Sequence, residues 1–340
     1  MANEKFQNAL HRKIQSCPPV WMMRQAGRYH SHYQKLRARH SFMELCKNPE
    51  LAAQVALGPI QDFDFDVAIL FSDLLFPLEG LGMGLSYGDS GPKLEWSLNE
   101  KTLSRLAGVD QALEGLLFQK EAVRLTRQAL APNKSLVGFV GGPWTLFSYA
   151  VQGQHEGNEA QARRELFPAF CKKMIPLLVA NIQLQLNSGA EIVMIFDTAA
   201  GNLTPVEFSD VAISETVKLA EAHPGRLAYY SKNTTKKHLD HSVLKGAPWA
   251  GFGVDQNWNL EKEFSFFGHG FIQGNFDQNI LKTAAPGEFK ALLTQYLKPL
   301  RNLSPEKRAG WVCGLGHGIL PQTPESNVRT FVHTVREIFS

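Results

Sequence analysis

The sequence has few cysteines for its length, and none of them are paired in a motif. Its 340 residues contain four, at positions 17, 46, 171 and 313, and no two are spaced as CxxC. This excludes a disulfide-stapled scaffold and favours a reducing compartment. Cys313 lies near His317, but no second thiolate partner is close to them in the sequence, so we expect no metal site.

Long apolar runs and a strong net charge are also missing. Residues 1–15 are polar and lack the apolar stretch of a signal peptide, and the most apolar window, 136–151, is broken by a Gly-Gly-Pro sequence. With 35 Lys and Arg against 32 Asp and Glu, the formal charge is only +3, too little for a surface that coats nucleic acid. We therefore expect a cytoplasmic protein with no membrane span and no nucleic-acid partner.

Several catalytic motifs are absent. There is no GxxxxGK(S/T), HExxH or GxSxG, which argues against P-loop, zincin and α/β-hydrolase proteins. The glycine strings GLGMG at 80–84 and GLGHG at 314–318 lack the full dinucleotide-binding spacing, so turn geometry explains them better than phosphate binding.

The sequence does have a regular alternation of strands and helices. Apolar residues make up 44% of the chain and charged residues 20%, which excludes a disordered chain, collagen and a coiled coil. Eight short, continuously apolar runs alternate with helix-length segments, at 19–24, 67–73, 135–142, 191–197, 226–232, 249–255, 270–276 and 310–318. Strands covered on both faces have this character. Because no Pro/Gly/Ser-rich linker divides the chain, the pattern favours one α/β domain over 1–340, a (β/α)8 TIM barrel.

Three helices have recognisable ends. Asn48 and Pro49 open one, and another, with an apolar face from Phe167 to Leu178, stops near Gly189. The last begins with Thr323 as N-cap and Pro324 in its first turn, and its apolar residues Val328, Phe331, Val332, Val335 and Phe339 predict one buried face.

Polar residues stand at the ends of the apolar runs. They are Arg24, Asp73, the Gly141-Gly142-Pro143 turn, Asp197, Lys232, Asp255, Asn275 and His317. The carboxyl ends of barrel strands meet at one mouth, where active sites form, so these residues predict a site drawn from the whole chain. The alternative is that polar residues simply mark strand ends.

A basic stretch follows the first apolar run. It contains Arg24, Arg28, Lys35, Arg37 and Arg39. Arginine forks suit paired recognition of carboxylates or phosphates. The last three fit a solvated helix face, whereas Arg24 ends an apolar run and is the better candidate for binding an anion.

The motif MRQAGRY at 23–29 resembles the amino-terminal motif of the uroporphyrinogen decarboxylase family. ILFSDLL at 69–75, GFVGGPWTLFSY at 138–149, FDTAAG at 196–201, QGNFD at 273–277 and GLGHG at 314–318 resemble further blocks of that family in the same order. Together they cover essentially the whole chain. The resemblance implies a (β/α)8 barrel, a homodimer, and removal of CO2 from the four acetate side chains of uroporphyrinogen III to give coproporphyrinogen III, with no metal or organic cofactor.

The resemblance also implies which residues form the site. Asp73 matches the family's central aspartate, and Arg24, Arg28, Tyr149 and His317 match its other catalytic positions. The expected substrate-binding set is Arg24, Gln25, Arg28, Asp73, Tyr149, Thr198 and His317. Decarboxylating a pyrrole acetate needs an electron sink, which a protonated ring supplies, and a fixed carboxylate would stabilise that cation. A guanidinium is a poor general acid near neutrality, so the proton donor stays open.

The chain departs from the family pattern at three places. Thr198 stands where serine is usual, Asp255-Gln256 where an aspartate-tryptophan pair is usual, and Gly314 where asparagine is common. Trp258 follows two positions after Gln256. A shifted loop or a lost wall of the site would explain the second departure.

Two alternative functions stay open at this point. One is a zinc-dependent methyltransferase of the same superfamily, which needs a His-x-Cys pair that this sequence lacks. The other is a tetrapyrrole-binding homologue without turnover, against which Arg24, Arg28, Asp73 and Tyr149 all argue because none of them has been lost.

Overall fold

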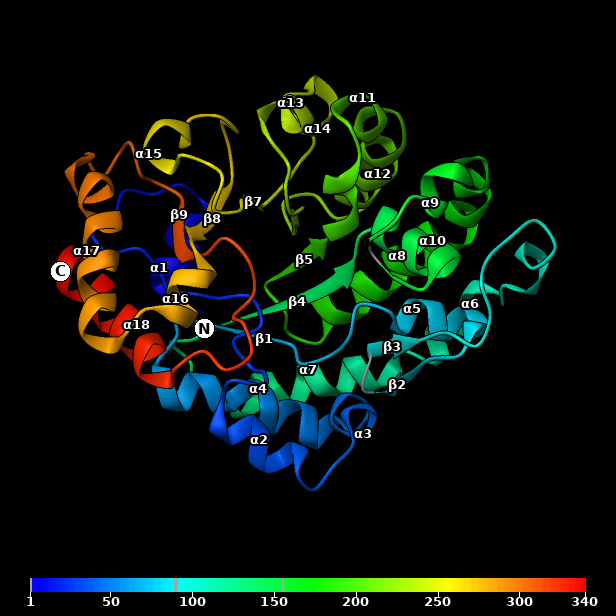
Figure 1. Ribbon diagram of the computed structural model, residues 1–340, viewed down its shortest axis with the longest axis horizontal. Helices are drawn as coiled ribbons and strands as arrows, with labels where there is room; N and C mark the ends of the chain where they lie inside the picture. The colour runs from blue at the N-terminus through cyan, green and yellow to red at the C-terminus, as the bar shows by residue number, and fades with distance from the viewer. Residues whose placement is uncertain (1, 89–90, 155) are drawn as a thin grey trace.

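The computed structural model describes residues 2–88, 91–154 and 156–340 (Figure 1). Within them, seven strands form one curled sheet in the order β1-β4-β5-β6-β7-β8-β9, and every neighbouring pair is parallel. β2 and β3 form a separate antiparallel hairpin. The bounds are β1 (Val67–Ile69), β2 (Ser86–Gly88), β3 (Gly91–Lys93), β4 (Ser135–Gly141), β5 (Ile192–Phe196), β6 (Leu227–Tyr230), β7 (Gly251–Gly253), β8 (Phe271–Phe276) and β9 (Trp311–Leu315).

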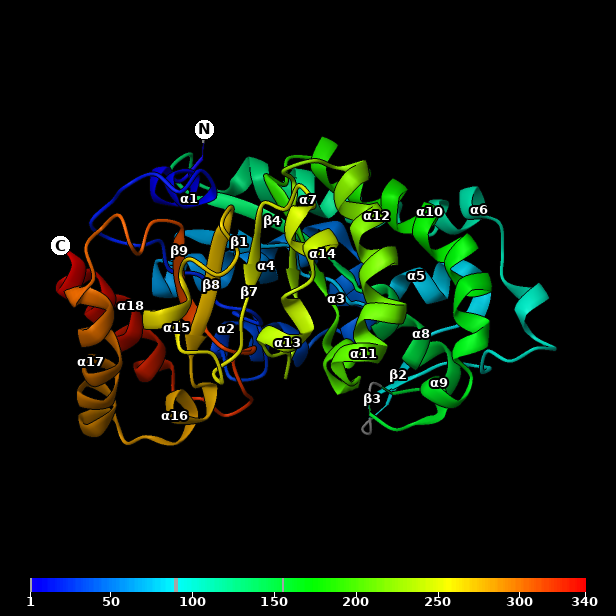
Figure 2. The ribbon, with the colours of Figure 1, turned by 90° about the horizontal axis from the view of Figure 1, so that it is seen from above.

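Helices occupy the segments between the strands and surround the sheet (Figures 1 and 2). They are α1 (Glu4–Leu10), α2 (Ser31–Arg37), α3 (Phe42–Lys47), α4 (Pro49–Phe63), α5 (Phe76–Leu78), α6 (Val109–Glu114), α7 (Leu117–Ala129), α8 (Pro143–Gln152), α9 (Glu159–Ala162), α10 (Phe167–Asn187), α11 (Pro205–Glu207), α12 (Ser214–Ala222), α13 (Lys236–Leu239), α14 (Ser242–Gly246), α15 (Leu260–Glu263), α16 (Gln278–Thr283), α17 (Pro286–Asn302) and α18 (Glu325–Phe339). Parallel strands with helices around them confirm the predicted α/β barrel-like fold. Among the described residues, no helix is both long enough and apolar enough to cross a bilayer.

The predicted strand at 19–24 is wrong as a strand, although its residues fill the seam between the two edges of the sheet. Val20 forms a single parallel bridge with Cys313 of β9, and the Trp21 N–H donates to the Cys313 carbonyl at 3.0 Å. On the other side, the Val20 carbonyl accepts from the Asp66 N–H at 3.0 Å. The Val20 N–H donates to the Asp66 carboxylate at 2.8 Å instead of to a strand carbonyl. The Asp66 side chain thus takes the place of a backbone acceptor that a neighbouring strand would offer to the Val20 N–H.

Successive side chains of the strands pack on opposite sides of the sheet. Val137, Met194 and Tyr230 belong to the core inside the barrel, whereas Tyr229 belongs to the layer between the sheet and the helices. Phe6 of α1 packs against the inner core, and α1 lies at the opposite end of the strands from α16 (Figure 2). The end of the barrel next to α1 is therefore closed by apolar side chains, and the opposite end carries the loops that follow the strands.

The predicted helix ends are mostly confirmed. The Asn48 side chain accepts from the Leu51 N–H and caps α4, and Gly189, with a φ of 117°, follows the end of α10. In α18 the apolar face is buried as predicted. The predicted Thr323 cap is wrong, because Pro324 itself occupies the N-cap and the Thr323 hydroxyl donates to the Leu320 carbonyl.

Candidate active site

Asp73 lies in the loop that follows β1, at the carboxyl end of the parallel sheet. Its Oδ1 accepts from the Leu75 N–H at 2.8 Å, a local turn that fixes the carboxylate. Burial raises the pKa of Asp73, and the nearby Tyr87 hydroxyl, the Leu75 N–H and the charge of Arg24 oppose that rise.

Arg24 has an unusual backbone that directs its side chain across the mouth of the barrel. Its φ is 55°, in the left-handed region, and its exposed side chain lies between the buried residues Met23 and Gln25. The side chain crosses Gly318, where a Cβ would come within 2.5 Å of Arg24 Cδ. Its positive charge lowers the pKa values of Asp73, Tyr149 and Tyr230 against the larger effect of burial, which raises them.

Tyr149 lies on α8, the helix that begins directly after β4. Asp197 at the end of β5 holds the start of this helix, because its Oδ1 accepts from the Thr145 N–H at 2.7 Å and from the Thr145 hydroxyl at 2.8 Å. A Cβ at Gly142 would lie 2.2 Å from the Asp197 side chain, so only glycine fits there. Burial raises the pKa of Asp197 to about 6. Asp197, predicted as one of the polar strand ends, therefore positions α8 and is sealed from solvent.

His317 follows β9 and contacts a tyrosine of β6. The Tyr230 hydroxyl lies 3.0 Å from His317 Nδ1 and 2.8 Å from the Gly316 carbonyl, and the two rings are stacked at 19°. Residues from five places in the chain thus meet at the barrel mouth: Arg24, Asp73, Tyr149, Tyr230 and His317. We refer to them as the mouth cluster.

Comparison with known proteins identifies the family. The profile of the family described as "Uroporphyrinogen decarboxylase (URO-D)" matches residues 1–338. A uroporphyrinogen decarboxylase from Carboxydothermus hydrogenoformans is 32% identical over 99% of this chain and 97% of its own length, and one from Anaeromyxobacter dehalogenans is 33% identical over 97% of both. The chain belongs to the uroporphyrinogen decarboxylase family. The prediction of an enzyme of the carboxy-lyase class is confirmed at this level.

Solved structures agree on the fold. A methyltransferase from Methanosarcina mazei superposes with a TM-score of 0.76 over 99% of this chain and 98% of its own, at 19% identity. A putative vitamin-B12-independent methionine synthase from Listeria monocytogenes gives 0.56 over 96% and 98%, at 12% identity. At such identities the similarity shows the barrel architecture and not the reaction.

The remaining predicted substrate-binding residues are Arg28, Thr198 and Gln25. Arg28 is exposed, and its charge acts on Tyr33. Thr198 is partly exposed in the turn that follows Asp197. The Gln25 side chain is fully buried and donates from Nε2 to the Val67 carbonyl at 3.0 Å. Their contacts with a substrate stay predictions.

Two tyrosines of the site were not predicted from the sequence. Tyr230 ends the apolar run of β6, and Tyr87 lies in the hairpin strand β2. The Tyr87 hydroxyl is buried beside Asp73, whose pKa it lowers, and its ring packs on Phe42 at 4.6 Å. A tyrosine in an apolar run has no sequence signal that separates it from a core residue.

The departure from the family at Asp255-Gln256 accompanies a tightly fixed loop. The Asp255 carboxylate accepts from the backbone N–H groups of Asn233 and Asn257, at 2.7 and 3.0 Å. Trp258 is buried, and its indole N–H donates to the Thr234 carbonyl at 2.7 Å. Asp255 is therefore a structural joint of this loop, and Trp258 is buried within it.

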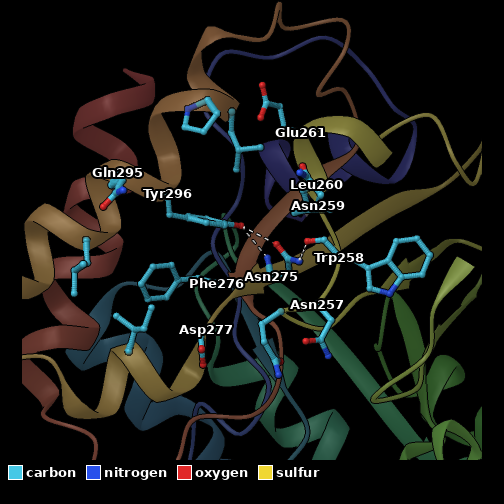
Figure 3. Close-up of a pocket in the computed structure, with 15 residues that line it drawn as sticks. Asn257, Trp258, Asn259, Leu260, Glu261, Asn275, Phe276, Asp277, Gln295 and Tyr296 are labelled. Carbon is cyan, nitrogen blue, oxygen red and sulfur yellow. Dashed lines mark hydrogen bonds between the residues drawn. The ribbon is translucent and has the colours of Figure 1, made fainter.

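Asn275, predicted as a polar strand end, anchors the same loop from β8. Its Nδ2 donates to the carbonyls of Asp255 and Trp258, both at 2.7 Å. The Tyr296 hydroxyl donates to its Oδ1 at 3.1 Å, and Figure 3 shows Asn275 between Trp258 and Tyr296. These residues border a cavity of about 600 Å³ between the loop and α17. The residues that line this cavity do not include any of the mouth cluster, so it is a separate feature of the wall.

The presence of glycine at position 314 is explained by the close packing of residues 19–21 against β9. A Cβ at this position would lie 2.1 Å from the Trp21 carbonyl oxygen and 2.8 Å from Gln273 Nε2. The close approach of residues 19–21 to β9 therefore requires glycine where asparagine is common in the family.

Cys313 is a buried strand residue whose thiol is influenced by Cys17. Its side chain is fully buried in β9, where burial raises the pKa of the thiol. Among the described residues, no group of three or more His, Cys, Asp and Glu side chains could hold a metal ion. The described residues therefore do not bring together the zinc ligands that the methyltransferase alternative needs.

Proposed function

We propose that this protein is a uroporphyrinogen decarboxylase that converts uroporphyrinogen III to coproporphyrinogen III. The observation that carries the proposal is that Asp73 and Arg24 lie close enough at the mouth of a barrel of this family for the charge of Arg24 to lower the pKa of the carboxyl. The Asp73 carboxylate and the exposed Arg24 guanidinium both lie at the mouth of the barrel. This is the arrangement needed for a reduced tetrapyrrole whose ring becomes cationic and whose side chains are carboxylates.

Asp73 would stabilise the positive charge of the pyrrole ring during decarboxylation. When a pyrrole carbon is protonated, the ring becomes an iminium-like cation that accepts the electrons left by departing CO2. A carboxylate held by the Leu75 N–H faces this cation without reorienting, and its oxygens accept from pyrrole N–H groups. Asp73 therefore stabilises charge that develops in the transition state.

Arg24 and Arg28 would bind the substrate's carboxylates. Both side chains are exposed. The charge of Arg24 acts on Asp73, so Arg24 is the better candidate to contact the departing acetate. A guanidinium keeps its proton near neutrality, so we assign neither arginine as the proton donor.

Tyr149, His317, Thr198 and Gln25 would complete the site. The Tyr149 hydroxyl and the His317 imidazole suit carboxylates, Asp73 or a proton-carrying water. Thr198 keeps the hydroxyl of the serine usual in the family and adds a methyl group. Because the Gln25 side chain is buried against β1, we propose that it supports the loop that carries Arg24 and meets substrate through its main chain.

The family resemblance supports three further proposals. They are that the enzyme works without a metal or organic cofactor, that it is a homodimer, and that it acts in the cytoplasm.

The test is an anaerobic assay of the purified protein with chemically reduced uroporphyrinogen III, with and without chelator, followed by chromatography of the oxidised products. Products with seven, six, five and four carboxylates, formed at equal rates with chelator, are expected. Saturable tetrapyrrole binding without any product would instead favour the non-catalytic homologue. Transfer of a methyl group that is abolished by chelator would favour the zinc-dependent methyltransferase.

A further inference from the structure

His317 and Tyr230 form a hydrogen-bonded pair in which the acceptor of the phenol hydrogen decides the tautomer of the imidazole. The Tyr230 hydroxyl is within hydrogen-bond distance of two groups, the Gly316 carbonyl at 2.8 Å and His317 Nδ1 at 3.0 Å. A carbonyl can only accept, and a phenol has one hydrogen to donate. If that hydrogen goes to Gly316, the phenol oxygen can only accept from the imidazole.

The Gly316 carbonyl is a fixed acceptor. The Gly316 N–H donates to the Phe276 carbonyl at 2.9 Å, and a Cβ at Gly316 would lie 2.3 Å from the Gln256 nitrogen. The backbone between β9 and His317 is therefore held between the end of β8 and the loop that follows β7, which keeps the Gly316 carbonyl directed at Tyr230.

Tyr230 is fixed as well. It is 1% exposed, belongs to the core inside the barrel, and packs edge-on against Phe196 at 6.1 Å. Burial and the charge of Asp255 raise the pKa of Tyr230 while Arg24 lowers it, with a net rise, so the phenol keeps its hydrogen at neutral pH.

We propose that Tyr230 is a positioning residue that holds neutral His317 in the tautomer with hydrogen on Nδ1, so that Nε2 is the nitrogen that exchanges protons. The proposal rests on the proposed function for its role in turnover, but not for the tautomer itself. In this tautomer Nε2 accepts a hydrogen bond when the ring is neutral and donates one to a substrate carboxylate only after taking up a proton. The orientation of the ring and the site of its proton are thus set by a residue that need not touch substrate.

The chain offers a matched control in the neighbouring residue. Tyr229 is also 1% exposed and also hydrogen-bonded, but it faces the outer layer, where its hydroxyl donates to Asp197 Oδ2 at 3.3 Å. Tyr229→Phe therefore removes a buried hydroxyl from the same strand without touching His317.

The experiment is to label the 11 histidines of the full-length protein with ¹⁵N in their rings and to record long-range ¹H–¹⁵N spectra at a pH where they are neutral. His317→Gln identifies the His317 signals by their loss. We expect the pattern of protonated Nδ1 and unprotonated Nε2 in the wild type and in Tyr229→Phe, and its loss in Tyr230→Phe. In the decarboxylation assay, kcat/KM of Tyr230→Phe should fall about 10-fold, as for the loss of one hydrogen bond.

Hydrogen on Nε2 in the wild type, or an unchanged tautomer in Tyr230→Phe, would overturn the proposal. Its failure is distinguishable from failure of the proposed function, because the spectra do not depend on turnover. A wild type that shows the Nδ1–H tautomer but makes no decarboxylated product refutes the function and leaves the pair intact. A wild type that forms decarboxylated product but carries hydrogen on Nε2 supports the function and refutes the proposal about Tyr230.

Discussion

Gly318 lies directly under the side chain of Arg24, and a Cβ at this glycine would approach Cγ to 2.7 Å and Cβ to 3.0 Å. These atoms are near the Arg24 backbone, which is itself held at a φ of 55°, so the side chain cannot move aside without changing direction.

Gly318→Ala should therefore weaken substrate binding more than folding. We expect KM for uroporphyrinogen to rise about 10-fold, the effect of one lost charge-assisted contact, with little change in melting temperature. Gly287→Ala is the control, because nothing lies within 4 Å of a Cβ at that glycine of α17. Equal kinetics for both alanine variants would refute the role given to Gly318.

Asp73→Asn should give a folded protein with turnover lowered about 10²-fold or more, because the amide is neutral and cannot stabilise the cationic ring. Its carbonyl oxygen can still accept from the Leu75 N–H, so the loop should persist. Product chromatography gives the rate, and thermal unfolding is the control for the fold. Near-normal turnover would contradict the role of Asp73.

Tyr87→Phe should move the acid limb of the kcat/KM profile to higher pH. The Tyr87 hydroxyl lowers the pKa of Asp73, so without it the carboxyl stays protonated to a higher pH and the active, ionised form is lost sooner on acidification. Tyr33→Phe is the control, since this tyrosine packs on Phe71 in the same aromatic group and does not act on Asp73. A profile identical to that of the wild type would disprove the coupling.

Asp197 makes stability depend on pH in a defined window. Burial raises its pKa from 3.8 to about 6 in the folded protein, so the folded state binds this proton more tightly than the unfolded chain does. The free energy of unfolding should therefore fall, relative to Asp197→Asn, as pH rises from about 4 to about 6, by about 3 kcal/mol. Denaturant unfolding of both proteins across this range measures it. A difference that does not vary with pH would exclude the effect.

Much of the fold follows from the sequence because it depends on apolar pattern. Seven of the eight predicted runs are strands, and the caps at Asn48 and Gly189 mark helices correctly. The run at 19–24 fails because periodicity cannot show that the Asp66 carboxylate takes the Val20 N–H, or that Pro19 has no N–H to offer a neighbouring strand.

The site is less predictable from the sequence. Asp73, Arg24 and His317 stand at the ends of apolar runs, where a parallel sheet brings them together. Tyr230 ends such a run too, but its role depends on which side of the sheet it faces and on a carbonyl 86 residues away. Asp197 and Asp255 illustrate the opposite error, because polar strand ends also serve as joints between loops.

Gly314→Ala should destabilise the fold by about 2 kcal/mol or more, because the added carbon meets the Trp21 backbone rather than a flexible side chain. Chemical denaturation measures the loss, and Gly246→Ala, with open space around its Cβ, is the control. Unchanged stability would show that residues 19–21 can shift away from β9 without a measurable loss of stability.

The seam also sets an order of events during synthesis. Asp66 Oδ2 accepts from Val20, its Oδ1 lies 2.7 Å from Lys5 Nζ and 3.7 Å from an Arg336 nitrogen, and β9 supplies the other edge. One carboxylate therefore gathers groups from both ends of this sequence. A nascent chain cannot close the barrel until β9 has left the ribosome, so the edge of residues 19–21 that pairs with Cys313 waits unpaired while nearly 300 residues are made after it. A circular permutant that joins the two ends and opens elsewhere would bring the halves of the seam close together in the chain and remove that wait.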